Sequence, residues 1–249
     1  MEKPNGFTPL FNTSREAAHY QRSSGVLLVL LYLHLGTVIA NWLPAWSLCL
    51  SIPILVVRWM LAIHELFHLR TEKEVDPLSR LMPLLLTPLS IGYREHLLMH
   101  NGHHHHMATP EDPEYFQLRG NRFVGFLNAL TAPEQAFIRW AAAHGLDREL
   151  ALGALVRLGL FAALVLASGP LFAWYWLTVR LSHALSFFSF FYLLHRRGPD
   201  FGVYRVTLPS GAARLYQTLF GADNLTAITH HDLHHRHPRV AARHLPDIA

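Results

Sequence analysis

The chain has 249 residues, of which 51% are hydrophobic and only 15% are charged, whereas soluble domains carry roughly 25% charged residues. Its formal net charge of +4 includes no Lys/Arg tract suited to a nucleic acid, so we expect no nucleic-acid partner. The single Cys49 excludes an internal disulfide. Long apolar runs alternate with short polar ones, which is typical of an integral membrane protein.

Residues 1–24 are polar, and we expect a cytoplasmic N-terminal segment there, followed by a single membrane domain over 25–249. Four apolar runs are long enough to cross a bilayer as helices: 25–43, 47–63, 151–167 and 171–194. His34 in the first run has no histidine near it in sequence, so we interpret it as packed or hydrogen-bonded rather than as a ligand. Arg157 and Arg180 lie in the last two runs, where we expect them to snorkel to an interface.

Two further segments are expected at the membrane without crossing it. Residues 78–93 are apolar but short, and Pro83 and Pro88 interrupt them, which indicates a re-entrant or in-plane segment. Residues 121–147 alternate apolar pairs with charges, as helices on a membrane surface do.

The distribution of positive charge predicts the orientation. The short turns 41–46 and 168–170 contain no Lys or Arg, whereas the other connecting segments are rich in them. By the positive-inside rule these two turns face outward and both termini are cytoplasmic. The predicted fold is therefore all-α: an integral membrane helical bundle with about four spans, a re-entrant or interfacial segment, and a cytoplasmic cap rich in histidine.

Three histidine clusters fall on this cytoplasmic side. They read HELFH at 64–68, HNGHH at 100–104 and HDLHH at 231–235. Histidines at i, i+3 and i+4 share one face of a helix, and neutral imidazole is the commonest metal ligand. With a histidine at the end of the fourth span, these clusters supply nine candidate ligands: His64, His68, His100, His103, His104, His195, His231, His234 and His235. One metal ion cannot use nine nitrogens, so the pattern favours two metals with open positions.

Two other classes of protein remain open. Taken alone, the sequence HELFH is the zinc-protease motif, with Glu65 as general base. That class needs roughly one further ligand and leaves the other two clusters unexplained. A metal transporter or sensor without redox chemistry would place titratable ligands near the middle of the membrane, whereas these clusters lie at span ends.

The three clusters, their order and the surrounding spans resemble the membrane-bound fatty acid desaturase/hydroxylase superfamily, whose members carry three such histidine boxes around a di-iron centre. HELFH and HNGHHHHMATPEDP look like the alkane monooxygenase branch. The chain length, the D-P-E-Y tail, His195-Arg196 and HHDLHHRHP look like the carotenoid ketolase branch. The resemblance covers roughly residues 50–240 and leaves the choice between these branches open.

The resemblance implies two iron ions held by the nine histidines and O₂ as co-substrate. The implied reaction is oxidation of an unactivated C–H bond in a lipid-like substrate, giving a double bond or an alcohol. Electrons would come from an external ferredoxin-like or similar donor, because no flavin or nicotinamide fingerprint is visible. Three carboxylates, Glu65, Asp112 and Asp232, are candidates for orienting the ligands.

The run of four histidines at 103–106 offers more than one pair as metal ligands. His103 and His104 keep the H-x-x-H-H spacing with His100, and we favour them as ligands over His105 and His106. The sequence leaves the role of His96 open, and we expect no ligand role for the remaining pair, His230 and His237.

Overall fold

The computed structural model describes residues 13–82, 87, 89–107 and 109–249. Within these residues the fold is almost entirely helical, and a single two-stranded hairpin pairs β1 (Arg196–Arg197) with β2 (Asp200–Phe201). The expected all-α class is confirmed. The helices of this described part are α1 (Thr13–Ile39), α2 (Leu48–Leu69), α3 (Pro77–Leu81), α4 (Tyr93–His106), α5 (Arg122–Leu130), α6 (Ala132–His144), α7 (Arg148–Ser168), α8 (Leu171–Phe187), α9 (Leu193–His195), α10 (Ser210–Phe220), α11 (Ala222–Thr229) and α12 (His231–Arg236).

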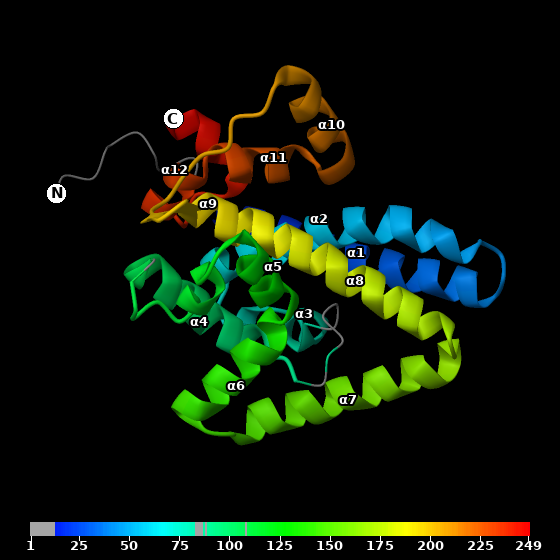
Figure 1. Ribbon diagram of the computed structural model, residues 1–249. Helices are drawn as coiled ribbons and strands as arrows, with labels where there is room; N and C mark the ends of the chain where they lie inside the picture. The colour runs from blue at the N-terminus through cyan, green and yellow to red at the C-terminus, as the bar shows by residue number, and fades with distance from the viewer. Residues whose placement is uncertain (1–12, 83–86, 88, 108) are drawn as a thin grey trace.

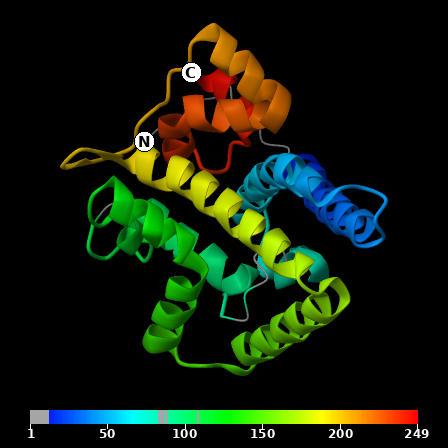
Figure 2. The same cartoon turned by 45° about the vertical axis from the view of Figure 1, so that its right-hand side comes forward.

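The described residues contain four helices that are long and apolar enough to cross a membrane, which confirms the expected number of spans. They cover Ser14–Ile39, Ala45–Leu69, Arg148–Ser168 and Leu171–His195. The turns that join α1 to α2 and α7 to α8 lie at one end of the bundle, while α4, α9 and α12 gather at the other end (Figures 1 and 2). The histidine clusters therefore share one end.

The spanning helices pack around α2. Leu28, Leu31 and Leu35 of α1 are fully or almost fully buried, and they belong to the same core cluster as Ile52 and Val56 of α2. Helix α8 packs on another face of α2. By contrast, α7 exposes large apolar side chains such as those of Leu155 and Leu166 along most of its length. Such a surface suits contact with lipid rather than with water.

Helix α1 begins well before the apolar run at 25–43 that we expected to form the first span. Its polar first half is stabilised by the C-terminal part of the chain: Tyr20 donates a hydrogen bond to Asp223 at 3.0 Å, and Glu16 forms an ion pair with Arg243 at 3.2 Å. These partners lie about two hundred residues away in the sequence, so local pattern could not show them.

The two intramembrane arginines do not snorkel, so that expectation was wrong. Arg157 is 1% exposed, and its guanidinium donates a 2.5 Å hydrogen bond to the carbonyl of Ser90. Arg180 is 5% exposed and binds Glu134 at 2.8 Å. Both arginines find acceptors inside the protein, because segments from outside the spans return against them.

The segment predicted to be re-entrant lies only partly within the described residues, since 83–86 and 88 are outside them. Its first part is the short helix α3, which Asp76 caps by accepting a hydrogen bond from the amide of Ser79 at 2.9 Å. Helices α5 and α6 occupy the region where surface helices were expected. Helix α5 packs against α8 and against the π-helical turn Phe188–Tyr192 that follows it. The approach to this turn is close, since a Cβ on Gly125 would lie 2.5 Å from the ring of Tyr192.

Candidate metal centre

Helix α2 carries the first pair of histidines near its C-terminal end. Its last turns carry His64 and His68 on one face, with ring centroids 5.1 Å apart. The helix continues through the sequence HELFH and ends at Leu69, beyond the expected span end at residue 63. Both rings therefore stand on a rigid helix end and face helix α4.

Helix α4 carries the second set of histidines. Nε2 of His100 lies 2.9 Å from Nε2 of His68 and 3.2 Å from Nε2 of His104. His103 is 1% exposed and faces the third set of histidines, which is described next. His105, by contrast, is exposed and hydrogen-bonds the carbonyl of Asn101. The structure thus turns His103 and His104 toward the other imidazoles and leaves both His105 and the exposed His106 at the surface.

The third set comes from the end of the fourth span and from α12. A π-helical turn, Phe188–Tyr192, precedes α9 and ends the span at His195. Nε2 of His195 lies 2.9 Å from Nε2 of His235 and 3.2 Å from Nε2 of His231. π-helical turns are frequently found at functional sites, where they re-aim the side chains that follow.

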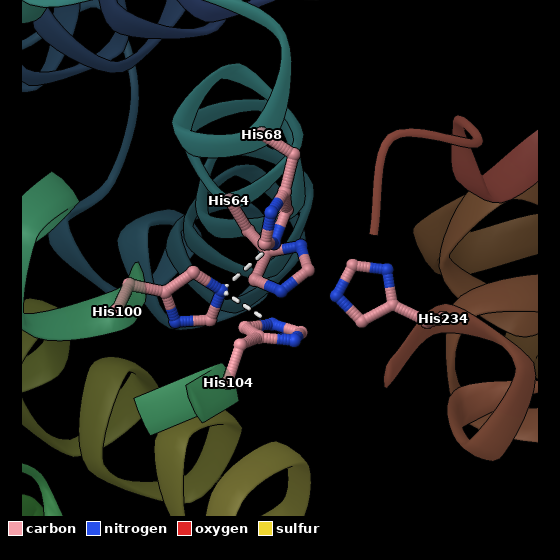
Figure 3. A group of neighbouring side chains, drawn as sticks. All are labelled: His64, His68, His100, His104 and His234. Carbon is pink, nitrogen blue, oxygen red and sulfur yellow. Dashed lines mark hydrogen bonds between the residues drawn. The ribbon is translucent and has the colours of Figure 1, made fainter. Parts of the chain in front are cut away.

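In the described part of the chain, two adjacent groups of side chains present nitrogen atoms within 4.8 Å of one another. The first group contains His64, His68, His100, His104 and His234, which converge from α2, α4 and α12 (Figure 3). The second contains His103, His195 and His235, and His231 lies beside it. All nine histidines singled out from the sequence meet at one end of the bundle.

Two of the three candidate carboxylates contact these imidazoles. Asp112 accepts a 2.8 Å hydrogen bond from Nδ1 of His103, and Glu65 accepts one from Nδ1 of His64 at 3.2 Å. The first contact needs a close approach, since a Cβ on Gly102 would lie 2.8 Å from Cγ of Pro113. Each carboxylate fixes the proton on the outer nitrogen and leaves the inner nitrogen free to bind a metal.

Asp232 lies differently from what the sequence suggested. One of its oxygens accepts a hydrogen bond from Arg205, and the other accepts a 2.6 Å hydrogen bond from Arg236. Two cationic partners orient this carboxylate toward the surface arginines. It therefore stabilises the start of α12 and does not orient an imidazole of the site.

Burial favours the neutral form of five imidazoles on α4 and α12. Desolvation first, and neighbouring imidazoles second, lower the pKa of His104 to about 3. The same causes place the pKa values of His100, His231 and His234 well below the ordinary value, and lower that of His235. A neutral imidazole has the free lone pair that a metal ion requires.

Of three polar residues beside the site, Glu114 and His183 were not predicted to be functional, and the sequence left the role of His96 open. Glu114 is buried, and desolvation raises its pKa to about 7, while its Oε2 lies 3.6 Å from Nδ1 of His100. His96 is enclosed, and desolvation lowers its pKa to about 4. His183 is 4% exposed, lies in the middle of the fourth span and stacks on Phe187. The HExxH and HxxHH spacings say nothing about these residues.

Three further histidines lie apart from the two groups. Nδ1 of His230 hydrogen-bonds the hydroxyl of Thr229 at 2.9 Å, and His237 is exposed. Nε2 of His34 hydrogen-bonds the hydroxyl of Ser47 at 2.8 Å, so the expectation that His34 is partnered is confirmed.

A cavity of about 100 Å³ lies against the inner face of the imidazoles. Its other walls are largely apolar and come from α2, with Trp59, Met60 and Phe67, and from the end of α8 and the π-helical turn, with Phe187 and Phe190. Apolar pockets with a few convergent polar groups are typical of sites for small molecules. This one places an apolar ligand directly beside the candidate metal ligands.

The fold and the site together define a helical membrane protein with a buried, histidine-rich site able to hold metal. The family model described as fatty acid desaturase matches residues 40–249, and the chain belongs to this family. Membership makes it a membrane-bound oxidoreductase and fits a lipid substrate in the bilayer. Comparison with curated proteins gives no match, and neither does comparison with solved structures.

Proposed function

We propose that the chain is an O₂-dependent di-iron oxidoreductase that acts on C–H bonds of a lipid-like substrate, as a fatty acyl desaturase or hydroxylase. The observation that carries this proposal is the convergence of eight imidazoles in two adjacent groups, with a ninth, His231, beside the second group, next to an apolar cavity. Nitrogen-rich ligation suits redox-active iron. Membership of the fatty acid desaturase family supports the same chemistry.

The donor set fits two ions. His64, His68, His100, His104 and His234 would hold one iron, and His103, His195, His231 and His235 would hold the other. All are nitrogen donors, and they come from the four helices α2, α4, α9 and α12, so folding brings them together. When bound, the two irons supply O₂ activation and the electron transfers that C–H cleavage requires.

The protein's own residues position the ligands and the substrate. Asp112 and Glu65 orient the rings of His103 and His64, and thereby select the nitrogen that faces inward. The apolar walls from α2 and α8 exclude water and hold the chain to be oxidised next to the imidazoles. The carbon that lies closest to them is then the one that reacts.

The position of Glu65 argues against a zinc protease. Its side chain is 3% exposed; Oε1 binds the outer nitrogen of His64, and Oε2 accepts a 2.8 Å hydrogen bond from the amide of Ala242. A general base must reach the water that attacks the substrate. Both oxygens of Glu65 are instead held behind the imidazole.

We further propose that the histidine-rich end and both termini face the cytoplasm, because the turns at the other end lack Lys and Arg. Electrons would arrive on that side from a ferredoxin-like or similar donor. Within the same superfamily, carotenoid ketolase or hydroxylase activity and alkane monooxygenase activity share the proposed chemistry and differ in substrate.

Expression in a host fed labelled fatty acids, alkanes and carotenoids tests the proposal. Lipid extracts should contain a new desaturated, hydroxylated or oxidised product, and a His64→Ala variant of equal abundance should give none. If neither strain makes any product while the purified protein holds a single zinc ion, the proposed function is wrong.

A further inference from the structure

Three polar groups with unused hydrogen-bonding atoms meet at the wall of the cavity. His96 comes from α4, Glu114 from the segment after α4, and His183 from the last turns of α8. Among the described residues, Nε2 of His96, Oε2 of Glu114 and Nδ1 of His183 have no hydrogen-bond partner. Buried polar atoms are almost always hydrogen-bonded. Three such atoms at one cavity therefore indicate a polar group of a ligand.

None of the three residues belongs to either group of converging nitrogens. Oε2 of Glu114 comes nearest to one of them, at 3.6 Å from Nδ1 of His100, which is beyond hydrogen-bond distance. The three residues also line a second, smaller void between α6 and α8. A titratable residue inside a spanning helix is costly and usually functional, and His183 is such a residue.

A groove adjoins the cavity and has a volume of about 410 Å³. Its walls come mainly from α2, α8 and α10, and most of its lining side chains are apolar, among them Trp174, Leu181 and Tyr216. The groove and the cavity share Val57, Ser186 and Phe190 in their walls. A lipid entering through the groove meets an apolar passage first and the polar groups last.

We propose that His96, Glu114 and His183 bind an uncharged oxygen, a hydroxyl or carbonyl, carried by an otherwise apolar lipid. The substrate would then be an oxygen-bearing lipid rather than a plain hydrocarbon. An imidazole can donate or accept a hydrogen bond, so the cluster accommodates either oxygen function. An ionised headgroup is disfavoured, because the surrounding walls are apolar and burying a charge is expensive.

This inference deepens the proposed function and rests on it. Imidazoles from both groups of converging nitrogens, including His64, His100 and His103, line the same cavity. An oxygen anchored at the polar cluster fixes the distance along the substrate to the carbon that lies beside them. The cluster would thus determine the position of oxidation.

The inference can be tested by measuring how tightly the protein binds two matched probes, without any catalytic turnover. Iron-loaded protein in lipid nanodiscs is titrated with tritiated 1-dodecanol and tritiated n-dodecane, and empty nanodiscs correct for partition into lipid. We expect the wild type to prefer the alcohol by about tenfold, as one or two net hydrogen bonds would give.

Variants of His183 test whether this residue causes the preference for the alcohol. His183→Phe keeps a ring over Phe187, whose centroid lies 5.3 Å away, but removes Nδ1, and the preference should fall to within about twofold. His183→Asn restores a polar atom near the Nδ1 position and should recover the preference. His34→Phe removes a histidine bonded to Ser47, away from the cavity, and should retain it. If His183→Phe fails to fold, His96→Phe and its rescue His96→Gln give the same comparison.

Three results would overturn the inference. These are binding of neither probe, equal affinity of the wild type for both probes after correction, and a preference that survives in both His183→Phe and His96→Phe. Each would mean that ordered water alone fills the polar end of the cavity. Iron content and lipid oxidation are measured separately, so a failed probe preference in an iron-loaded, active protein is distinguishable from failure of the proposed function.

Discussion

Nδ1 of His103 donates a 2.8 Å hydrogen bond to Oδ2 of Asp112, and the two side chains are 1% and 0% exposed. This bond leaves the lone pair on Nε2 of His103, which lies 3.3 Å from Nε2 of His195. Asp112 therefore determines which nitrogen the ring offers to the centre of the site.

Replacing this carboxylate should weaken metal binding. In Asp112→Asn the amide can donate to Nδ1 and stabilise the tautomer whose lone pair points outward, so we expect iron affinity to fall about 10- to 100-fold. Competition with a calibrated chelator measures the change. Asp232→Asn is the matched control, because that carboxylate binds Arg205 and Arg236 instead of a ring. Equal iron affinity in the two variants would contradict the assigned role of Asp112.

The metal content follows from the two groups of nitrogens. Protein purified from iron-replete cells should hold about two irons per chain, and a strong chelator should remove both together with activity. Elemental analysis measures this. One tightly held zinc ion with full activity would contradict the di-iron proposal.

The orientation can be tested with single cysteines. In a variant that lacks Cys49, an introduced cysteine at Thr109 or Asp232 should react only with reagents that reach the cytoplasm. One at Trp42, in the turn that lacks Lys and Arg, should react from outside. Labelling of position 109 from outside would reverse the proposed topology.

The contact between α5 and the π-helical turn should be sensitive to volume. In Gly125→Ala the new Cβ would lie 2.5 Å from the ring of Tyr192, so we expect a loss of about 1–3 kcal/mol in unfolding free energy. Gly159→Ala in α7 meets open space and should leave stability equal or slightly higher. Thermal unfolding in detergent compares the two variants. Equal stabilities would mean that α5 does not pack on Tyr192 in this way.

Periodicity and charge were enough to predict the spans and the convergence of the histidines. The spacing of His231, His234 and His235 places three rings on one side of a helix. The uncharged turns at 41–46 and 168–170 place all clusters at one end of the bundle. Both signals are local, so no knowledge of tertiary contacts was needed.

The polar residues around the cavity required tertiary contacts. His183 is a lone histidine in an apolar run, and only the packing of α8 turns it toward the cavity. Glu114 faces inward because Asp112 accepts a 2.8 Å hydrogen bond from its backbone amide and sets the turn after α4. No spacing rule in the sequence distinguishes Glu114 from Glu111, which is exposed.

The metal-ligand role of His195 and the surface role of His105 can be tested by comparing their alanine variants. Nδ1 of His195 donates to the carbonyl of Phe191 at 2.8 Å, so its Nε2 lone pair faces the histidines of the second group. His105 is exposed and bonds the backbone of its own helix. We expect His195→Ala to lose at least one iron and all activity, because no neighbouring imidazole replaces it. His105→Ala should keep both irons and most activity, as surface substitutions usually do. Iron content and turnover measured side by side settle the comparison: an inactive His105→Ala beside an active His195→Ala would require a shifted register in α4 and a site without His195.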